Sequence, residues 1–276
     1  MSTRARPAVQ DRTSRPVISR ARAATSAPWP PRTALVTGAS SGIGRVTALR
    51  LADLDTEILL VGRNGTALDE VAAATGGHRF ATDLAVVGSE NAVASRATEI
   101  LGNVDLLICS AGVGAAGPFE GMSTTALRNL VAVNVLSPMM LIRAILPGML
   151  ERGEGRILLV GSVAGALGVR GEVAYSASKA ALVGFADALR SEVAGRGVTV
   201  TLALPGAVDT PFFRRRGAPY VRRWPKPLPP GLVADRMLAA ASRGDAEVWV
   251  PGWMSLAARV HGIAPPIYRR LANVFG

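Results

Sequence analysis

The sequence has very few cysteines, histidines and lysines, and each shortage excludes something. Cys109 is the only cysteine, so no disulfide forms within the chain, and we expect a reducing, cytoplasmic compartment. The two histidines, His78 and His261, have no neighbours at metal-ligand spacing, so no metal site is predicted. Lysine is restricted to Lys179 and Lys226, and every other basic residue is an arginine.

The sequence also lacks a convincing membrane span and a signal-peptide core. Its long apolar stretch, residues 124–150, contains Asn134, Pro138 and Arg143, which favour a helix buried in the core or in a subunit interface. A buried amide such as that of Asn134 must find hydrogen-bond partners. It would fix a water, kink the helix, or serve the structure alone.

Acidic residues are scarce in two segments, which together carry a charge of +12, compared with +11 for the whole chain. Residues 1–32 contain seven arginines and one aspartate, and residues 211–230 contain six basic residues and no acid. The rest of the chain is close to neutral, so we expect no nucleic-acid binding. Residues 1–31 are predicted to be a disordered basic extension, and a misassigned start codon would explain the same composition.

Short apolar runs alternate with helical patterns from residue 33 onward. Strands are predicted at residues 33–37, 57–62, 78–82, 104–109, 156–161 and 199–204. Helices are predicted at residues 42–52, 65–75, 89–101, 124–150, 175–193 and 232–242. Repeated strand and helix units indicate an α/β fold, with a parallel sheet that carries helices on both faces. A chain of 276 residues is long enough for one such domain.

A glycine-rich turn, with the sequence GASSGIG, separates the first strand from the first helix. Such glycines permit a tight turn, close approach of the backbone to a pyrophosphate, and close packing of helix on sheet. The following helix directs its N-terminal amides and its dipole at the phosphates. The predicted cofactor contacts here are Gly38, Ser40, Ser41, Gly42, Ile43 and Gly44.

The end of the second strand indicates which dinucleotide binds. Arg63 stands where an acid would bind the ribose 2′-hydroxyl or an arginine the 2′-phosphate. Its neighbours Gly62 and Asn64 supply no carboxylate, so NADP is favoured and NAD remains possible. An ordinary solvated loop arginine is the alternative. Further cofactor contacts are predicted at Asp83, Leu84, Ser110, Ala111 and Gly112. Asp83 would accept a hydrogen bond from an adenine amino group or cap a helix.

A tyrosine and a lysine stand four residues apart, at Tyr175 and Lys179, in a helical pattern. They are therefore one turn apart on one helix face. A phenol has an ordinary pKa of about 10, and a neighbouring cation favours the phenolate and brings the pKa closer to neutrality. Ser162, at the end of the fifth strand, would hold the reacting oxygen. A chance helix with a solvated lysine is the alternative.

These motifs occur in order, and residues 32–250 resemble the short-chain dehydrogenase/reductase family. The matching motifs are TGxxxGxG from Thr37 to Gly44, Asn134, Ser162, YxxxK from Tyr175 to Lys179, and PGxVxT from Pro205 to Thr210. The resemblance implies a Rossmann-like, doubly wound parallel sheet of about seven strands. It also implies a homodimer or homotetramer formed through two long helices.

The resemblance further implies roles for individual residues. Tyr175 would be the acid/base and Ser162 would orient the carbonyl or alcohol. Lys179 would lower the pKa of the tyrosine and bind the nicotinamide ribose, while Asn134 would hold a water in the proton relay. Cofactor contacts would also come from Tyr175, Lys179, Pro205, Gly206, Val208 and Thr210, with the last two at the nicotinamide carboxamide.

Two departures from the family pattern stand out. The usual NNAG is replaced by Cys109-Ser110-Ala111-Gly112, so the asparagine that braces the central strand is missing. The chain also lacks the VDGG ending typical of bacterial 3-oxoacyl-(acyl-carrier-protein) reductases. We therefore treat that activity as an alternative.

Two segments remain for substrate binding and outside contacts. Residues 211–230 would form a substrate lid in which Phe212, Phe213, Tyr220 and Trp224 give apolar contact while arginines meet an anion; a soluble mobile flap is the alternative. Residues 251–276 form an amphipathic tail with aromatic and basic residues. It would pack on its own domain or a partner subunit, or lie on a membrane surface.

The sequence thus predicts an NADP(H)-dependent oxidoreductase that interconverts a carbonyl and a secondary alcohol on a largely apolar substrate. Such a substrate would be a lipid, steroid, retinoid or small ketone. A nucleotide-sensing scaffold without turnover is the rival hypothesis, and the complete tetrad argues against it.

Overall fold

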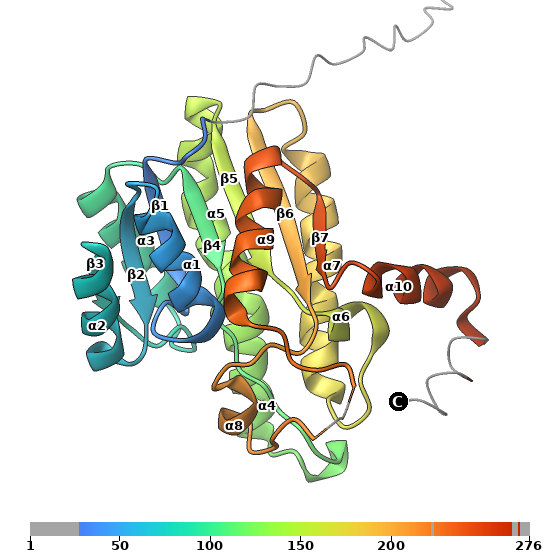
Figure 1. Ribbon diagram of the computed structural model, residues 1–276. Helices are drawn as coiled ribbons and strands as arrows, with labels where there is room; N and C mark the ends of the chain where they lie inside the picture. Colours follow the sequence, from blue (N-terminus) through green and yellow to red (C-terminus); the bar gives the residue numbers. More distant parts are fainter. Residues whose placement is uncertain (1–27, 222–223, 267–269, 271–276) are drawn as a thin grey trace, which may run out of the picture.

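A computed structural model describes residues 28–221, 224–266 and 270. The predictions for residues 1–27, 222, 223, 267–269 and 271–276 lie outside this part of the chain. Within it, the apolar runs form a parallel sheet of seven strands in the order β3-β2-β1-β4-β5-β6-β7 (Figure 1). The strands are β1 (Thr33–Thr37), β2 (Glu57–Gly62), β3 (His78–Ala81), β4 (Leu106–Cys109), β5 (Gly155–Val160), β6 (Val198–Pro205) and β7 (Glu247–Val250).

Long helices cover both faces of the sheet (Figure 1). One face carries α1 (Gly42–Ala52), α2 (Gly65–Thr75) and α9 (Pro230–Arg243). The other face carries α3 (Ser89–Leu101), α5 (Ser137–Arg152) and α7 (Val173–Glu192). The predicted Rossmann-like, doubly wound sheet is confirmed.

The shorter helices lie near the carboxyl ends of the strands (Figure 1). They are η1 (Phe119–Gly121), α4 (Thr124–Val131), α6 (Val163–Leu167), α8 (Phe212–Arg215) and α10 (Met254–Ile263). The strand order reverses between β1 and β4, because the chain continues from β1 to β2 on one side and from β3 to β4 on the other. Ligands of open α/β sheets bind at the carboxyl ends beside such a reversal.

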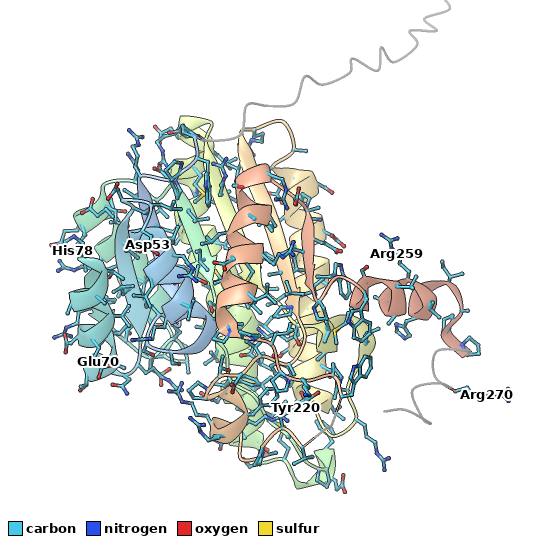
Figure 2. The ribbon with its side chains drawn as sticks, viewed as in Figure 1. Asp53, Glu70, His78, Tyr220, Arg259 and Arg270 are labelled. Carbon is cyan, nitrogen blue, oxygen red and sulfur yellow. The ribbon has the colours of Figure 1, made fainter. Side chains whose placement is uncertain are left out.

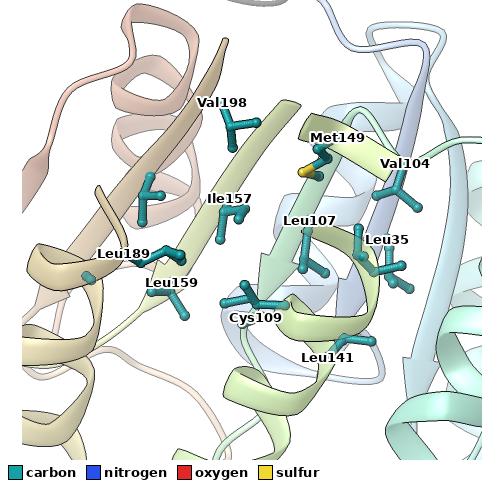
Figure 3. Close-up of a cluster of buried hydrophobic side chains, with 14 of the residues drawn as sticks. Leu35, Val104, Leu107, Cys109, Leu141, Met149, Ile157, Leu159, Leu189 and Val198 are labelled. Carbon is teal, nitrogen blue, oxygen red and sulfur yellow. The ribbon is translucent and has the colours of Figure 1, made fainter. Parts of the chain in front are cut away.

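Rows of apolar side chains across the sheet form the core. On one face the register aligns Leu35 with Leu59 and Leu107, and Leu107 with Ile157. These side chains pack against α3, α5 and α7, and Figure 3 shows part of the cluster. Side chains that alternate along each strand thus bury both faces of the sheet, as expected for central parallel strands.

The predicted long apolar helix runs from Thr124 to Arg152 through α4, a π-helical segment η2 (Ala132–Leu136), and α5. With its length and its mean hydropathy of 1.8, this helix could cross a membrane. No other helix among the described residues is both as long and as apolar. Leu141, Ile145 and Met149 nevertheless lie in the core. One side of the helix is therefore buried in the core, as the first of the two predicted alternatives requires, and the other side is exposed.

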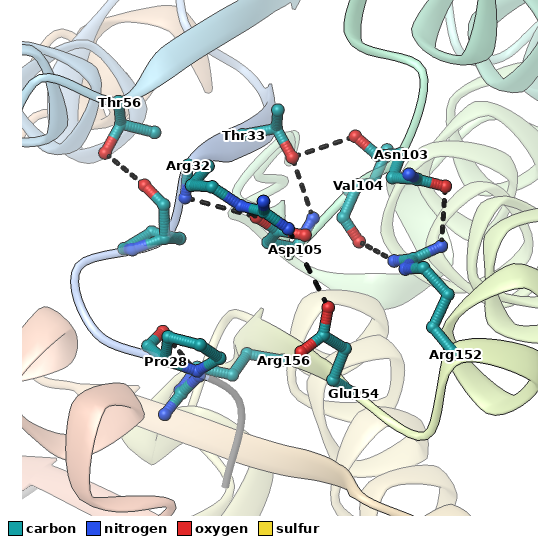
Figure 4. A network of polar contacts seen from close by, with 11 residues as sticks. Pro28, Arg32, Thr33, Thr56, Asn103, Val104, Asp105, Arg152, Glu154 and Arg156 are labelled. Atoms are coloured by element: carbon teal, nitrogen blue, oxygen red, sulfur yellow. Dashed lines mark hydrogen bonds and ion pairs between the residues drawn. The ribbon is translucent and has the colours of Figure 1, made fainter.

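The amino-terminal end of the sheet is closed by a polar network (Figure 4). Arg156 is only 2% exposed and donates to the carbonyl oxygens of Ala241 and Pro28, at 3.0 and 3.2 Å. Its guanidinium also lies over the ring of Trp29, which packs against the core. Pro28 and Trp29 therefore contact the fold although they precede the predicted domain start at residue 32.

Asp105 explains why β4 begins at Leu106 and not at residue 104 as predicted. Its carboxylate accepts a hydrogen bond from the amide of Arg32, and its own amide donates to Thr33 Oγ1. These side-chain bonds replace the backbone ladder on the side of β1, whereas Asp105 O still accepts from the amide of Arg156 on the side of β5.

At the position of the missing family asparagine, the chain after β4 is held by Thr37, at the end of β1. Its hydroxyl accepts hydrogen bonds from the amides of Ser110 and Ala111, both at 3.1 Å, and donates to Ile108 O. This threonine braces the end of β4 against β1. The end of β4 is therefore tied to its neighbouring strand although the asparagine is absent.

Candidate active site

A cavity of about 1440 Å³ opens at the carboxyl ends of the strands. The predicted catalytic and cofactor-binding residues all line it, with the exceptions of Gly44 and Asn134. Since pockets for single drug-sized ligands span about 300–1,000 Å³, this cavity has room for a dinucleotide and a second molecule.

The glycine-rich turn forms one end of the cavity. Gly38 has φ +69°, and a Cβ atom there would lie 2.8 Å from the amide nitrogen of Ala111. A Cβ atom on Gly44 would lie 2.5 Å from Gly38 O, so Gly44 supports the turn from behind. Both positions therefore require glycine, one for its backbone conformation and both for close packing.

The first turn of α1 faces the cavity. Ser41 precedes the helix, but its side chain caps none of the helix amides, and Ser41, Gly42 and Ile43 all line the cavity. Free amides at a helix start, together with the helix dipole, bind phosphate groups. The turn therefore fits the pyrophosphate of a dinucleotide.

Tyr175 and Ser162 come together at the cavity wall, at the start of α7 and just beyond β5 respectively. Both side chains are buried. Burial raises the pKa of Tyr175 to about 12, while a hydrogen bond with Ser162 acts in the opposite direction. Ser162 Oγ also accepts from the amide of Ala164, which fixes the hydroxyl at the start of α6.

Lys179 has a backbone partner of its own beside Tyr175. Its Nζ donates to Val160 O at 2.8 Å and lies 5.9 Å from the centroid of the Tyr175 ring. Burial lowers the pKa of Lys179 to about 8, and the cation that lowers the pKa of Tyr175 is Arg216. Lys179 and Tyr175 are helical neighbours as predicted, but the dominant effect on the phenol is its burial.

Asn134 lies behind the cavity wall, within the π-helical segment η2. Its Oδ1 accepts from the amide of Val113, and its Nδ2 donates to Val113 O and to Ser178 Oγ. Ser178 Oγ in turn donates to Tyr175 O at 2.7 Å. The side chain thus joins η2 to α7 and to the chain beyond β4, and both of its amide hydrogens already have protein partners.

Arg63 and Asp83 flank the cavity beyond the carboxyl ends of β2 and β3. Their charged atoms are 4.0 Å apart, and both side chains are largely exposed. Asp83 Oδ1 accepts from the amide of Ala85, so it closes a local turn and does not cap a helix. Asn64 caps α2 through the amide of Ala67.

The segment after β6 covers the cavity. Phe212, in α8, lies with its ring centroid 5.4 Å from that of Tyr175. Arg216 forms a 2.5 Å ion pair with Glu172, which precedes α7, and its guanidinium lies 4.6 Å from the Phe213 ring centroid. The described part of this segment is therefore packed against the site.

The tail supplies another wall of the cavity. Trp253, Met254, Ala257 and Val260 line it, and the rings of Trp253 and Trp224 stack at 5.0 Å. Figure 2 shows Tyr220 at the lower end of the molecule and Arg259 on α10. Met254 of α10 is thus buried against the domain, while Leu256 and Ile263 are exposed.

The sequence model of the short chain dehydrogenase family matches residues 32–220 of this chain. The chain belongs to the short-chain dehydrogenase/reductase family. The resemblance predicted from the motifs is confirmed, and the protein is an oxidoreductase of this family.

Curated relatives of this short-chain dehydrogenase include a ketoacyl reductase, HetN, from Nostoc sp., which is 37% identical over 64% of each chain. Human retinol dehydrogenase 8 is 37% identical over 66% of this chain and 60% of its own length. The chain thus spans less than two thirds of both relatives. The 3-oxoacyl-[acyl-carrier-protein] reductase FabG of Vibrio cholerae is 34% identical over 76% of this chain and 87% of the relative.

Two solved short-chain dehydrogenases have the same fold. One, from Sphingobium yanoikuyae in complex with NADPH, has a TM-score of 0.75 and 28% identity, covering 85% of this chain and 95% of its own. The other, from Burkholderia phymatum in complex with NAD, has a TM-score of 0.76 and 26% identity, covering 84% and 92%. The family thus includes members solved with either dinucleotide.

Several site residues of this short-chain dehydrogenase were missed from the sequence. Glu172 and Ser178 were not predicted at all. Arg215 and Arg216 were predicted only as members of a basic segment, without individual roles. Glu172 and Ser178 flank Tyr175, so their nearness in sequence was a usable signal. The arginines belong to an arginine-rich segment in which nothing distinguishes one from the next.

Proposed function

We propose that the protein is an NADP(H)-dependent dehydrogenase/reductase that interconverts a carbonyl and a secondary alcohol on a largely apolar substrate. One observation carries the proposal. Tyr175 and Ser162 meet at the wall of a cavity that also contains the uncapped first turn of α1. A proton donor and a phosphate-binding turn thus share one enclosed space.

The residues divide the chemistry between them. A bound nicotinamide supplies or accepts the hydride at C4. In the reduction direction, the Tyr175 O–H bond breaks and its proton passes to the substrate oxygen, while Ser162 holds that oxygen by a hydrogen bond. The raised pKa of Tyr175 keeps the phenol protonated near neutrality, as an acid requires. Lys179 keeps two N–H donors beyond its bond to Val160, and these would hold ribose hydroxyls.

In this proposal Asn134 is a positioning residue. Its bonds to Val113 and Ser178 fix the loop after β4 relative to α7. The predicted water in the proton relay would therefore be held by groups of η2 other than the side-chain amide hydrogens.

Arg63 supports a preference for NADP over NAD. It lines the cavity at the end of β2, its side chain is more than half exposed, and its ion pair with Asp83 is long at 4.0 Å. A guanidinium in this place would bind a 2′-phosphate, and Asp83 would accept from the adenine amino group.

The lining of the cavity supports an apolar substrate. Apolar side chains line the part of the cavity that lies near Tyr175, the lid and the tail. They are Val113, Leu167, Phe212, Met254 and Val260. Human retinol dehydrogenase 8, by its name, acts on an apolar alcohol, and this chain is 37% identical to it over the aligned part. Lipid-, steroid- or retinoid-like carbonyls are therefore the proposed class.

The alternative activity is that of a 3-oxoacyl-(acyl-carrier-protein) reductase, which the relative from Vibrio cholerae supports. The two hypotheses differ in the substrate, which is a thioester of an acyl carrier in one and a free carbonyl compound in the other. If a 3-oxoacyl thioester is reduced at least tenfold faster than apolar ketones and aldehydes of matched chain length, the alternative is the better one.

We further propose a cytoplasmic homodimer or homotetramer with peripheral membrane contact. The long helix exposes Val131, Leu136 and Met140, which would form a subunit interface. On α10, Leu256 and Ile263 are exposed beside Arg259, a pattern that suits an anionic lipid surface. Light scattering would test the first idea, and flotation with anionic vesicles the second.

Tyr175→Phe tests the proposed chemistry. The variant removes the transferable proton and keeps the ring that packs against Phe212. We expect reduction, followed by NADPH absorbance on a panel of apolar carbonyl compounds, to fall about 10²- to 10⁴-fold. NADPH affinity, measured by fluorescence titration, should remain within about twofold. Unchanged turnover would rule out the acid/base role.

Arg63→Ala tests the cofactor preference. Loss of a charge-assisted phosphate contact should weaken NADPH about tenfold while NADH affinity changes little. Asp69→Ala changes a charged residue of the same region that does not line the cavity, and serves as control. Equal weakening of both dinucleotides would remove the argument for NADP.

A further inference from the structure

The start of the lid lies directly on the glycine-rich turn. A Cβ atom added to Gly42 would meet the Thr210 side chain at 3.3 Å. Five residues later, Arg215 Nη1 donates a 2.8 Å hydrogen bond to Ser41 Oγ. Two contacts thus join the chain after β6 to the turn after β1, although Ser41 and Arg215 are 174 positions apart in sequence.

Ser41 is the residue through which Arg215 reaches the turn. Its backbone is extended, and its side chain caps no amide of α1. The hydroxyl therefore faces the cavity together with the first residues of the helix, and Arg215 lines the same cavity. The guanidinium lies one hydrogen bond away from the amides that fit a pyrophosphate.

The charge of Arg215 is not matched by an acid. Among the described residues, no ion pair within 4.0 Å includes it, whereas the next residue, Arg216, is paired with Glu172. A guanidinium has five N–H donors, and one bond to Ser41 leaves four. These remaining donors suit two oxygens of a phosphate group, which guanidinium binds in a fork geometry.

We propose that Arg215 binds the pyrophosphate of the dinucleotide from the lid side, opposite the first turn of α1. The proposal rests on the proposed function, because it assumes that a dinucleotide occupies this cavity. The phosphates would then lie between the helix amides and the guanidinium. The lid segment would thereby be attached to the cofactor as well as to Glu172.

This role is distinct from that of Arg63. The pyrophosphate is common to NADPH, NADH and ADP, whereas the 2′-phosphate occurs only in NADPH. Loss of the Arg215 contact should therefore weaken all three ligands by the same factor. Loss of Arg63 should affect NADPH alone.

The test compares Arg215→Gln with Arg214→Gln in the full-length protein. Both changes remove one positive charge from exposed positions of α8, but Arg214 is not among the residues that line the cavity. Dissociation constants for NADPH, NADH and ADP are measured by titration calorimetry. We expect Arg215→Gln to weaken each about tenfold, Arg214→Gln to stay within twofold of wild type, and Arg215→Lys to recover part of the loss.

Three results would overturn the proposal. One is equal affinity of the Arg215→Gln and Arg214→Gln proteins for all three ligands. Another is weakening of NADPH alone, which would assign Arg215 to the 2′-phosphate. The third is a wild-type protein that binds none of the three, which would overturn the proposed function as well. The first two results leave that function intact.

Discussion

The two ends of the sheet differ in how fully the protein itself satisfies their positively charged side chains. At the amino-terminal end, Arg152 and Arg156 donate to backbone carbonyls, and Arg32 pairs with Asp105 and Glu154 (Figure 4). At the carboxyl end, Arg63 and Arg216 pair with acids, but no ion pair among the described residues includes Lys179 or Arg215, which also line the cavity. The same type of residue thus closes one end and leaves donors available at the other.

The difference indicates which end of the sheet contributes mainly to stability and which mainly to ligand binding. Partners at the amino-terminal end come from the protein itself, so its cations contribute to folding. At the carboxyl end, the buried ammonium of Lys179 is unfavourable in the folded protein, as its lowered pKa shows. We therefore expect changes at the first end to act on stability alone and changes at the second on ligand binding and pH dependence.

Arg156→Ala should have the largest effect on stability. It would leave a cavity beneath Trp29 and remove the donors to Ala241 O and Pro28 O. We expect a loss of about 2 to 4 kcal/mol in the free energy of unfolding, measured with urea. Arg32→Ala removes a largely exposed side chain and should cost less than about 1 kcal/mol. Lower turnover per folded Arg156→Ala molecule would break the comparison.

Lys179→Met should change how stability depends on pH. The folded pKa of Lys179 is about 8 and its ordinary value is 10.5, so between these values the unfolded chain binds a proton that the folded chain does not. Stability due to this group therefore increases with pH across the window. From pH 8 to 9, wild type should gain about 1 kcal/mol more than Lys179→Met.

The pH range and the control matter for this test. Above about pH 9 the raised pKa values of Cys109 and Tyr175 act in the opposite direction, because the unfolded thiol and phenol lose protons first. Lys226→Met alters the only other lysine, which is exposed, and should follow wild type. Identical pH curves for wild type and Lys179→Met would contradict the assignment.

Glu172→Gln should have the smallest effect and the most local one. The carboxylate raises the pKa of Tyr175, so its removal should lower that pKa. Alcohol oxidation needs the phenolate and rises with pH up to this pKa. The pH–rate profile for oxidation should therefore reach its plateau at lower pH in the variant. Glu120→Gln, at an exposed position, is the control. A plateau moved to higher pH would be inconsistent with this electrostatic account.

Much of the fold could be predicted because local patterns determine it. The bounds of β1, β2, α1, α2 and α3 agree with the prediction, since apolar runs there end at glycine, asparagine or aspartate. The prediction was less accurate where tertiary contacts decide. Asp105 shortens β4, and proline at position 230 lets α9 begin two residues earlier than predicted.

The site was predictable where chemistry follows sequence spacing and not where it depends on distant contacts. Tyr175 and Lys179 are one turn apart, so their adjacency follows from the helix. The pairing of Arg216 with Glu172 and of Arg215 with Ser41 joins separate segments, and no periodicity reveals it. The sign of the pKa shift of Tyr175 also depends on burial, which only the packed structure provides.

The placement of Trp29 has a practical consequence for attaching this protein to a surface. Because Trp29 and Pro28 are held at the amino-terminal end by Arg156, the chain enters the fold on the side away from the cavity. Immobilisation on a sensor chip or resin through residues before Pro28 would orient the cavity mouth toward the solution. A linker joined after α10 would instead begin close to Val260, which lines the cavity.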